Sequence, residues 1–554
     1  MTDLHPDEHY LKGAAVSTSC HTILPPDGED DNDINGQGAR GQQRYLGGLN
    51  RFHHLGHEDR TPSTPINTTI GGRYGAPNTI CDSPLTLIDA TFHWINKNLV
   101  GSIDFVIWTG DNARHDSDNT HPRTQGEINA LNKIVATKVL NTFPTAGPDG
   151  RRIPIIPSIG NNDIYPHNIL QPGPNPILRY FATIWSAFIP EDMTKTFARG
   201  GYYSVEVVPN KITVVSLNTL YFYLPNAAVD GCKEGDEQPG SEQMDWLEIQ
   251  LDKLRHRGMV AYLTGHVPPE KKSYSPTCYS RYTKIALAYQ DVIVGHLFGH
   301  ANIDHFFLLS RNVKQDGEGD VEEGGGGKGE KSVLEERVDG FDSFHTRGLG
   351  TYLEDLWMQY DSVPKCAQMK DYAIAMVSPS VVPTFNPTLR VFTYQLNHST
   401  DEDGTIKAQP AVDDLEDNDE DAEEEEQHEL EEDSTLYLNT DHSAAHQWTA
   451  LRRHRRKRHH HRRRPDPVPT TTFGFPQEFT QYWCNLTKVN RHPTGRPATY
   501  EIEYQTRDDY GLENLGVSEW LALARRIARE DDLKKVYLDR MVVQSGANTT
   551  VALV

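Results

Sequence analysis

The sequence predicts an α/β fold in which two mixed sheets stack between flanking helices, with a C-terminal lobe and disordered insertions. Short runs of β-branched and other apolar residues end at Gly followed by a polar residue. Stretches with apolar residues at helical spacing lie between these runs, so strands and helices alternate as in a layered core. Only 36% of the 554 residues are apolar, which indicates that part of the chain lies outside any core.

Five apolar runs predict buried strands. They cover residues 103–108, 153–159, 212–218, 259–264 and 291–294. Helical spacing of apolar residues predicts three helices, over 83–99, 125–143 and 241–258. The first of these helices begins at Ser83 and Pro84, because Ser is a favoured cap and Pro a favoured first helical residue.

Sharp changes in composition define the predicted domains. A core domain of residues 1–399 contains a Gly/Glu-rich, flexible insertion at about 313–338. Residues 413–433 hold 15 acidic residues and no Lys or Arg, and residues 452–464 hold nine basic residues. We therefore expect a disordered segment over 400–470. A predicted strand at 500–504 and a helix at 517–529 indicate that residues 471–554 form a lobe packed on the core.

The chain carries 54 basic and 78 acidic residues, a formal net charge of −24. This sign disfavours a general nucleic-acid binder, so no nucleic-acid partner is expected, and an anionic substrate would need local positive charge. No stretch approaches the ~20 apolar residues of a transmembrane helix, which excludes a polytopic membrane protein. The basic tract could be a solvated linker, a partner of the acidic tract or a secondary tether for a polyanion.

The six cysteines are widely spaced and none forms CxxC, which excludes zinc-ribbon and thioredoxin motifs. Their even number suits up to three disulfides in an oxidising compartment. Four N-x-S/T sequons give mild support for a lumenal or secreted protein. They lie at Asn67, Asn397, Asn485 and Asn548.

Side chains suited to metal binding occur in five short loops, most of which follow a predicted strand. They are Asp3, His5, Asp111, Asn161, His266, His300 and Asn302. One such loop is usually a turn or a helix cap, but five in succession are specific, because ligands at the carboxyl ends of strands are held rigidly beside an open edge. Two divalent cations ~3.5–4 Å apart that share a bridging hydroxide can promote in-line displacement at phosphorus.

Asp111 is the best candidate for a carboxylate that bridges two cations. Asp3 and His5 would complete one site, with the side-chain oxygen of Asn302 as a further ligand. The other site would be completed by Asn161, His266 and His300. The donors are oxygen and nitrogen without thiolate, which suits Mg, Mn, Fe, Co or Zn rather than Cu(I) or an iron–sulfur cluster.

The ordered series of Asp-x-His, Gly-Asp, Gly-Asn, Gly-His and Gly-His-x-Asn resembles the motifs of the calcineurin-like metallophosphoesterases. Two strings, GDNARHD (110–116) and YGAPNTICDSP (74–84), are similar to the acid-sphingomyelinase-like branch. Other strings are similar to the fungal endopolyphosphatases, namely DLHPDEHY (3–10), IGNNDIYPHN (159–168), SLNTLYFY (216–223), TGHVPP (264–269) and GHLFGHANIDHFF (295–307). The resemblance covers about 1–400 and extends to YWCNLT and to 500–535. It implies a two-sheet metallophosphoesterase sandwich, two divalent metal ions, and metal-dependent cleavage of inorganic polyphosphate at internal phosphoanhydride bonds.

Two positions depart from the wider superfamily. Asn162 stands where a catalytic His usually follows the metal-binding Asn, and Asn302 replaces the last His of the final motif. An amide cannot act as a general acid, but an internal phosphoanhydride expels a phosphate whose second pKa is ~6, and this leaving group needs little protonation. Asn162 therefore favours an anhydride over an ester as substrate. His115 is the candidate catalytic proton donor.

Three residues are candidates for contact with the phosphates of a substrate, namely Arg114, Asn162 and His167. Arg114 could bind a phosphate through two hydrogen bonds or pair with a nearby carboxylate. His115 and His167 could instead be loop histidines with ordinary hydrogen bonds. Lys271 and Lys272 could line a path for a polyanion, although adjacent lysines are usually solvated.

The Asp-x-His motif usually ends a buried first strand, yet only Met1 and Thr2 precede Asp3. The resemblance implies a vacuolar catalytic region with an N-terminal membrane anchor, which this sequence lacks. We therefore expect the sequence to be truncated at its N-terminus. Without a first strand, Asp3 and His5 would be poorly held.

Two other functions stay open. An acid-sphingomyelinase-like phosphodiesterase acting on lipid or nucleotide would carry Gly-Asn-His where Gly160, Asn161 and Asn162 stand. A catalytically impaired homologue used for binding would hold close to no metal.

Overall fold

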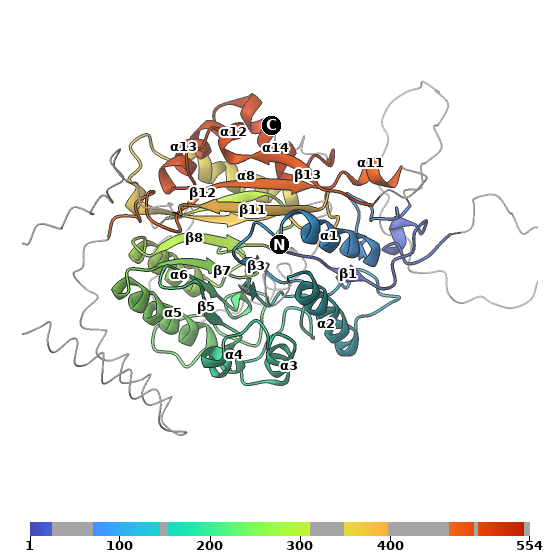
Figure 1. Ribbon diagram of the computed structural model, residues 1–554, viewed down its shortest axis with the longest axis horizontal. Helices are drawn as coiled ribbons and strands as arrows, with labels where there is room; N and C mark the ends of the chain where they lie inside the picture. Colours follow the sequence, from blue (N-terminus) through green and yellow to red (C-terminus); the bar gives the residue numbers. More distant parts are fainter. Residues whose placement is uncertain (25–69, 144–152, 311–347, 397–464, 492–496, 548–554) are drawn as a thin grey trace, which may run out of the picture.

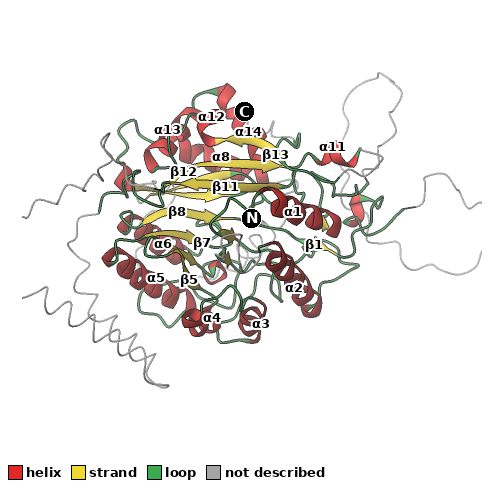
Figure 2. Cartoon of the chain, viewed as in Figure 1, coloured by secondary structure: helices red, strands yellow, loops and turns green. Residues whose placement is uncertain are grey.

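The computed structural model describes residues 1–24, 70–143, 153–310, 348–396, 465–491 and 497–547. Within these ranges the chain forms a mixed α/β fold with several sheets, in agreement with the predicted fold class (Figure 1, Figure 2). The predicted insertion at 313–338 and the acidic and basic tracts at 413–433 and 452–464 lie outside the described residues.

The largest sheet has six strands in the order β5-β6-β7-β8-β10-β9. Their bounds are β5 Tyr203–Val208, β6 Ile212–Ser216, β7 Val260–Thr264, β8 Ile293–Phe298, β9 His305–Ser310 and β10 Tyr372–Val377. Strands β6, β7, β8 and β10 are parallel to one another, whereas β5 and β9 pair antiparallel at the two edges. The carboxyl ends of the parallel strands therefore meet at one edge of the sheet.

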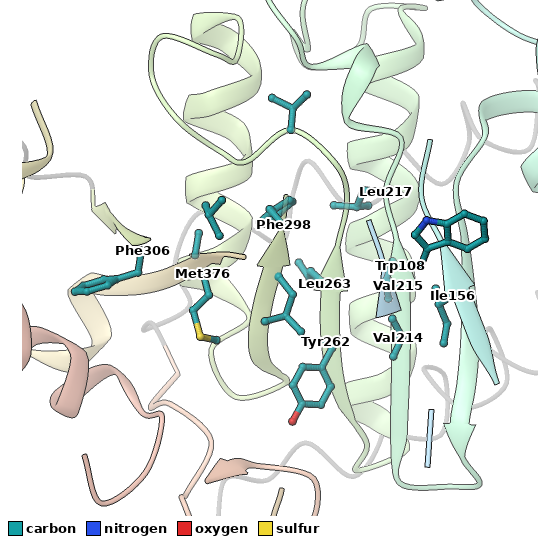
Figure 3. Packing of buried hydrophobic residues seen from close by; sticks show 14 of the residues in the cluster. Trp108, Ile156, Val214, Val215, Leu217, Tyr262, Leu263, Phe298, Phe306 and Met376 are labelled. Atoms are coloured by element: carbon teal, nitrogen blue, oxygen red, sulfur yellow. The ribbon is translucent and has the colours of Figure 1, made fainter. Parts of the chain in front are cut away.

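A separate pair of parallel strands lies beside β6 and extends the same edge. Its members are β3 Val106–Trp108 and β4 Ile155–Pro157. The hydroxyl of Ser216 in β6 donates to the carbonyl oxygen of Pro157 at 2.8 Å. Trp108 and Ile156 are fully buried and pack beside β6 (Figure 3).

A second sheet, in the order β11-β12-β13, lies against the first (Figure 1). Its strands are β11 Thr388–Tyr394, β12 Pro476–Trp483 and β13 Glu501–Gln505. The hydroxyl of Tyr262 in β7 donates to the carbonyl of Gly474 at 2.7 Å, and Gln481 of β12 donates to the carboxylate of Asp304 at 3.0 Å. Chain segments about 200 residues apart thus meet between the two sheets.

Helices lie on both outer sides of the sheets (Figure 2). They are α1 Leu85–Asn98, α2 Gln125–Thr142, α3 Pro176–Ile184, α4 Thr194–Gly200, α5 Pro239–His256, α6 Pro276–Ala288, α8 Gly348–Asp361, α11 Leu486–Asn490, α12 Thr506–Tyr510, α13 Val517–Ile527 and α14 Asp531–Met541. Helix α13 reaches the core through Trp520, whose ring centroid lies 4.6 Å from that of Phe306 in β9. Among the helices that the structure describes, none combines the length and apolar character of a membrane span.

Two of the three predicted helix starts differ from the structure by one or two residues, whereas α2 begins at the predicted Gln125. Pro84 was expected as the first residue of α1 but caps it, because Ser83 and Pro84 form the short strand β2, which pairs with β1 Pro6–Asp7. Helix α5 begins at Pro239, two residues before the predicted Ser241. In both cases the proline defines the helix start through its constrained φ.

The N-terminal residues are firmly held, contrary to the expectation from the sequence. The backbone N–H of Asp3 donates to the carbonyl of Gly110 at 3.0 Å, and its own carbonyl accepts from the N–H of Val382 at 2.8 Å. Asp3 and His5 are both fully buried. Residues 1–3 thus lie between the loop after β3 and residues 381–382, and hydrogen bonds on both sides replace the long strand that the motif usually ends.

All six cysteines lie in the described part of the chain. Two disulfides form, Cys20–Cys81 and Cys232–Cys278. Cys366 is exposed and Cys484 is buried, and both are free thiols. Disulfides are typical of proteins that fold in an oxidising compartment such as the secretory pathway.

Candidate metal centre

The loops at the carboxyl ends of β3, β4, β7 and β8 bring together Asp111, Asn161, His266 and His300. Nε2 of His266 lies 3.2 Å from Oδ2 of Asp111 and 2.8 Å from Oδ1 of Asn161. Nδ1 of His300 lies 3.1 Å from the same Nε2 atom. Nitrogen and oxygen donors from four loops therefore converge on one point.

A second group of donors lies on the other side of Asp111. Nε2 of His5 is 3.4 Å from Oδ2 of Asp111 and 3.8 Å from Oδ1 of Asp3. The ligand atoms of Asp111, His266 and His300 lie within 4.8 Å of one another, as do those of Asp3, His5 and Asp111. Oδ2 of Asp111 faces both groups, which is the position that a bridging carboxylate requires.

The donor atoms fit a cation because several have no other partner. Within the described residues, Oδ1 of Asp3, Nε2 of His5 and Oδ1 of Asn302 are buried without a hydrogen bond. Nδ1 of His5 donates to the carbonyl of Ala113 at 2.7 Å, which leaves a lone pair on Nε2. A buried polar atom without a partner costs about 1–3 kcal/mol, and a bound divalent cation would remove that cost.

Five of the candidate ligands have a left-handed backbone conformation. Their φ angles are 49° for Asp3, 40° for His5, 58° for Asp111, 70° for His300 and 57° for Asn302. Non-glycine residues adopt this conformation at a cost of order 1–3 kcal/mol each, and such residues cluster at functional sites. The sharp turns aim the side chains back across the ends of the strands.

Two glycines allow the loops to approach each other closely. A Cβ on Gly160 would overlap the carboxylate and the backbone nitrogen of Asp111, and a Cβ on Gly299 would overlap the side chains of Thr2 and Asp3. The Gly that directly precedes Asn161 and the Gly that directly precedes His300 are therefore each required by packing against a second loop.

The buried donors shift one another's pKa values. Burial disfavours ionisation of Asp111, but the neighbouring His266 and His5 hold its pKa well below the usual range. Burial disfavours a charged His266, yet Asp111 raises its pKa to about 9. Burial and the charge of His266 lower the pKa of His300 to about 3. A divalent cation would displace the proton of His266, because a ligating imidazole must be neutral.

Comparison with known proteins shows the family. No protein-family model matches the chain. An endopolyphosphatase of Cryptococcus neoformans is 37% identical over 455 residues, 80% of this chain and 64% of the relative. One of Yarrowia lipolytica is 38% identical over 437 residues, 74% of this chain and 57% of the relative. One of Schizosaccharomyces pombe is 32% identical over 562 residues, 99% of this chain and 86% of the relative.

The chain belongs to the endopolyphosphatase family. The alignments with the Cryptococcus and Yarrowia endopolyphosphatases span less than two thirds of those proteins' own length.

In this member of the endopolyphosphatase family, His115 lies beside the candidate metal ligands. Its ring stacks on that of His5, with centroids 3.9 Å apart and planes at 18°. Asp82 holds it in place, because Oδ1 lies 2.6 Å from Nδ1 and Oδ2 accepts from the backbone N–H at 2.7 Å. Burial disfavours ionisation of Asp82, but His115 lowers the pKa of that carboxyl. The sequence interpretation missed Asp82, although it lies in the similar string at 74–84.

Asn162 contacts Asp111 through two hydrogen bonds, from N to Oδ1 and from Nδ2 to Oδ2, each 2.9 Å long. Its carbonyl and its side-chain oxygen accept from Nη1 of Arg123, at 3.0 and 3.3 Å. The amide proposed to contact substrate is therefore engaged in orienting Asp111. Arg123 was not identified from the sequence, because no motif marks it.

Asp163 connects the two central loops and was also missed, although it directly follows Asn162. Its Oδ2 accepts from the backbone N–H groups of Asp111 and Gly160, each at 2.9 Å. Burial and the charge of Asp111 raise the pKa of Asp163 to about 6. This carboxylate fixes the loop after β3 relative to the loop after β4.

Arg114 and His167 make contacts within the protein. Nε of Arg114 donates to Oε1 of Glu127 at 2.5 Å, and the arginine is almost fully buried, so the structure favours pairing with a carboxylate over contact with a phosphate. Nε2 of His167 lies 3.1 Å from Nδ2 of Asn161 and so helps to orient that amide. Of the two lysines, Lys272 pairs with a surface carboxylate.

Proposed function

We propose that the chain hydrolyses inorganic polyphosphate at internal phosphoanhydride bonds and releases shorter polyphosphate chains. The observation that carries this proposal is the position of Asp111 between two groups of donors, in a chain that belongs to the endopolyphosphatase family. The two stacked sheets, with helices outside them and donor loops at the strand ends, support assignment of the fold as a metallophosphoesterase sandwich.

Two divalent metal ions are proposed to bind at the centre. Asp3, His5 and Asp111 would hold one ion, with Asn302 as a further oxygen donor. The second ion would be held by Asp111, Asn161, His266 and His300. When bound, such ions supply a nucleophilic hydroxide at neutral pH and neutralise charge on the phosphoryl group. Mixed nitrogen and oxygen donors suit Mn, Mg, Co, Zn or Fe.

Besides the two metal ions, His115 is proposed as a catalytic side chain. It is partly exposed, with 29% of its side chain accessible, while the neighbouring ligand His5 is fully buried. With Asp82 at Nδ1, its Nε2 is the nitrogen that would hold or move a proton at the oxygen of the leaving phosphate. The paired carboxylate stabilises the charged ring and fixes its orientation.

Asn162 supports an anhydride rather than an ester as substrate. Its amide hydrogen bonds to Asp111 and Arg123 leave it in a positioning role, and an amide provides no acid for an alkoxide leaving group. A phosphate leaving group departs with far less protonation. We therefore expect no strong acid catalysis from Asn162.

The proposed location is the vacuole lumen or vacuolar membrane. The two disulfides support a chain that folds in the secretory pathway. Membrane attachment through an N-terminal anchor is part of the same proposal. The predicted division into a catalytic domain of 1–399, a segment of 400–470 and a lobe of 471–554 is likewise proposed.

Chain-length analysis tests the proposed reaction. Long polyphosphate is incubated with the purified full chain and each divalent metal, and the products are separated on a gel at several times. Intermediate lengths at early times are expected, because internal bonds are cut. Release of single phosphates without intermediate lengths would contradict internal cleavage.

Two variants connect that activity to the proposed centre. Asp111→Asn should lose cleavage and the metal bound at the candidate centre, whereas His93→Ala, an exposed residue of α1, should retain both. Full cleavage by Asp111→Asn would refute the proposed role of this residue.

A further inference from the structure

A second cluster of histidines lies outside the candidate metal centre. His9 and His21 come from the N-terminal segment, and His121 comes from the loop between β3 and α2. The ring centroid of His121 is 5.1 Å from that of His9 and 5.1 Å from that of His21. The centroids of His9 and His21 are 5.6 Å apart. The sequence motifs predicted none of these residues as a metal ligand.

The donor atoms of the cluster converge on Asp118. Its Oδ2 lies 2.6 Å from Nδ1 of His21 and 2.9 Å from Nδ1 of His121. All three donor atoms lie within 4.8 Å of one another. One carboxylate oxygen and two imidazole nitrogens thus share a single small volume.

Further hydrogen bonds hold these donors in that orientation. Nε2 of His21 lies 2.8 Å from Oδ2 of Asp7, and both side chains are almost fully buried. Oδ1 of Asp118 accepts from the backbone N–H of Thr120 at 2.8 Å and from its hydroxyl at 2.6 Å. A ligating histidine typically donates its other ring nitrogen to a carboxylate, and a ligating carboxylate is itself hydrogen-bonded. The cluster has both features.

We propose that His21, Asp118 and His121 bind a structural metal ion of the zinc class, with His9 as the fourth ligand. Zn–N distances of about 2.0–2.1 Å in a tetrahedral site place imidazole centroids about 5 Å apart. The three measured ring separations match that spacing. Two or three imidazoles favour zinc or a similar transition metal over Mg²⁺ or Ca²⁺, which prefer oxygen ligands.

The ion would join two segments that are about 100 residues apart in the sequence. His21 follows Cys20, whose disulfide to Cys81 already ties the N-terminal segment to the region before α1. Asp118 lies three residues after His115 in the same loop. The proposed ion therefore holds in place the loop that carries the candidate catalytic histidine, and it goes beyond the two ions of the proposed function.

Zinc content after equilibrium dialysis of the full chain tests the site. His21→Gln and Asp118→Asn should each lower the content by about one ion per chain relative to wild type. The exposed His93→Ala serves as the matched control and should retain the wild-type content. His9→Ala, which changes a side chain that is 41% exposed, should weaken zinc binding by at least about tenfold.

The variant Asp111→Asn distinguishes zinc bound at this cluster from metal bound at the candidate metal centre. In that variant zinc should still raise the midpoint of thermal unfolding by a few degrees, and addition of His21→Gln should abolish the shift. The site is refuted if the cluster variants retain the zinc content of wild type, or if zinc shifts the double variant as much as Asp111→Asn alone. Either result would mean that His21 only bridges two carboxylates as a protonated ring. Neither result depends on polyphosphate cleavage.

Discussion

Asn162 donates to both carboxylate oxygens of Asp111, from its backbone nitrogen to Oδ1 and from its side-chain nitrogen to Oδ2. Asn162, which stands where a catalytic His usually occurs, therefore fixes the carboxylate that faces both groups of candidate metal donors. Arg123 holds the other end of the same amide. This arrangement makes Asn162 a positioning residue, and it leads to the first prediction.

Asn162→Ala should reduce kcat for polyphosphate cleavage by at least about tenfold, with a smaller change in KM, because it removes a hydrogen bond to a buried carboxylate worth about 1.5–3 kcal/mol. Steady-state kinetics and metal analysis of the variant measure this effect. Asn162→Asp should be more damaging, because it places a second negative charge beside Asp111. Wild-type kcat in either variant would contradict the positioning role.

Asn162 also predicts which class of substrate the protein cleaves. Wild-type protein should cleave polyphosphate at least about 100-fold more efficiently than an alkyl phosphate monoester, because acid catalysis of that order is missing for an alkoxide leaving group. The kcat/KM values for both substrates, measured with the same metal, provide the comparison. Equal efficiency on both substrates would refute the interpretation of Asn162.

His115→Ala should lower kcat by about tenfold, less than the usual ~10²- to 10⁴-fold contribution of proton transfer, because a phosphate leaving group needs little protonation. Asp82→Asn should have a smaller effect and should move the pH dependence of kcat, because Asp82 stabilises the protonated ring. The pH profiles of wild type and of both variants are the measurement.

Metal analysis controls for indirect damage to the neighbouring His5. Both variants should keep the wild-type metal content, since neither residue is a proposed ligand. Loss of metal without any change in the pH profile would assign His115 a structural role instead.

The cysteines predict a definite pattern of thiol reactivity. In the native, unreduced protein only Cys366 should react with a thiol reagent, because Cys484 is buried and burial raises its pKa to about 12. Denaturation without reduction should expose the second thiol. Mass spectrometry of the labelled protein counts the modified cysteines, and four reactive cysteines in the unreduced chain would contradict the two disulfides.

Glu503 in β13 predicts how stability depends on pH. Burial raises its pKa to about 8, well above the value of ~4.3 for an unfolded chain. Between these values the folded protein keeps a proton that the unfolded chain has released. The stabilising contribution is therefore complete below pH ~4.3 and is lost as the pH rises through 8, with a slope on the order of 1 kcal/mol per pH unit.

Glu503→Gln should remove this slope and make the protein more stable than wild type at pH 8, because the amide oxygen can still accept from Gln481 without carrying a charge. Urea unfolding of both proteins at pH 5 and pH 8 measures the difference. Identical pH dependence in the two proteins would show that Glu503 is ionised in the folded state.

Several elements were predictable because their signals are local. Strands β3, β4, β6, β7 and β8 consist of buried runs of apolar residues, and the helices α1, α2 and α5 show apolar residues at helical spacing. Strands β5, β9 and β10 were not identified. β5 is an edge strand with partly exposed positions, and β9 begins at His305, within the string GHLFGHANIDHFF. β9 and β10 are themselves buried apolar runs, so they carry the same local signal as the strands that were predicted.

The sequence by itself determined the kinds of donor atoms and their place at the ends of strands, because a buried strand and the turn after it are formed by consecutive residues. Only the tertiary structure decided which side chains meet. Asp82 and His115 are 33 positions apart, Asn162 and Asp111 are 51, and His21 and Asp118 are 97. Such pairs depend on how separate loops approach in a low-dielectric interior, where a buried charge requires a partner. No local pattern of residues encodes that approach.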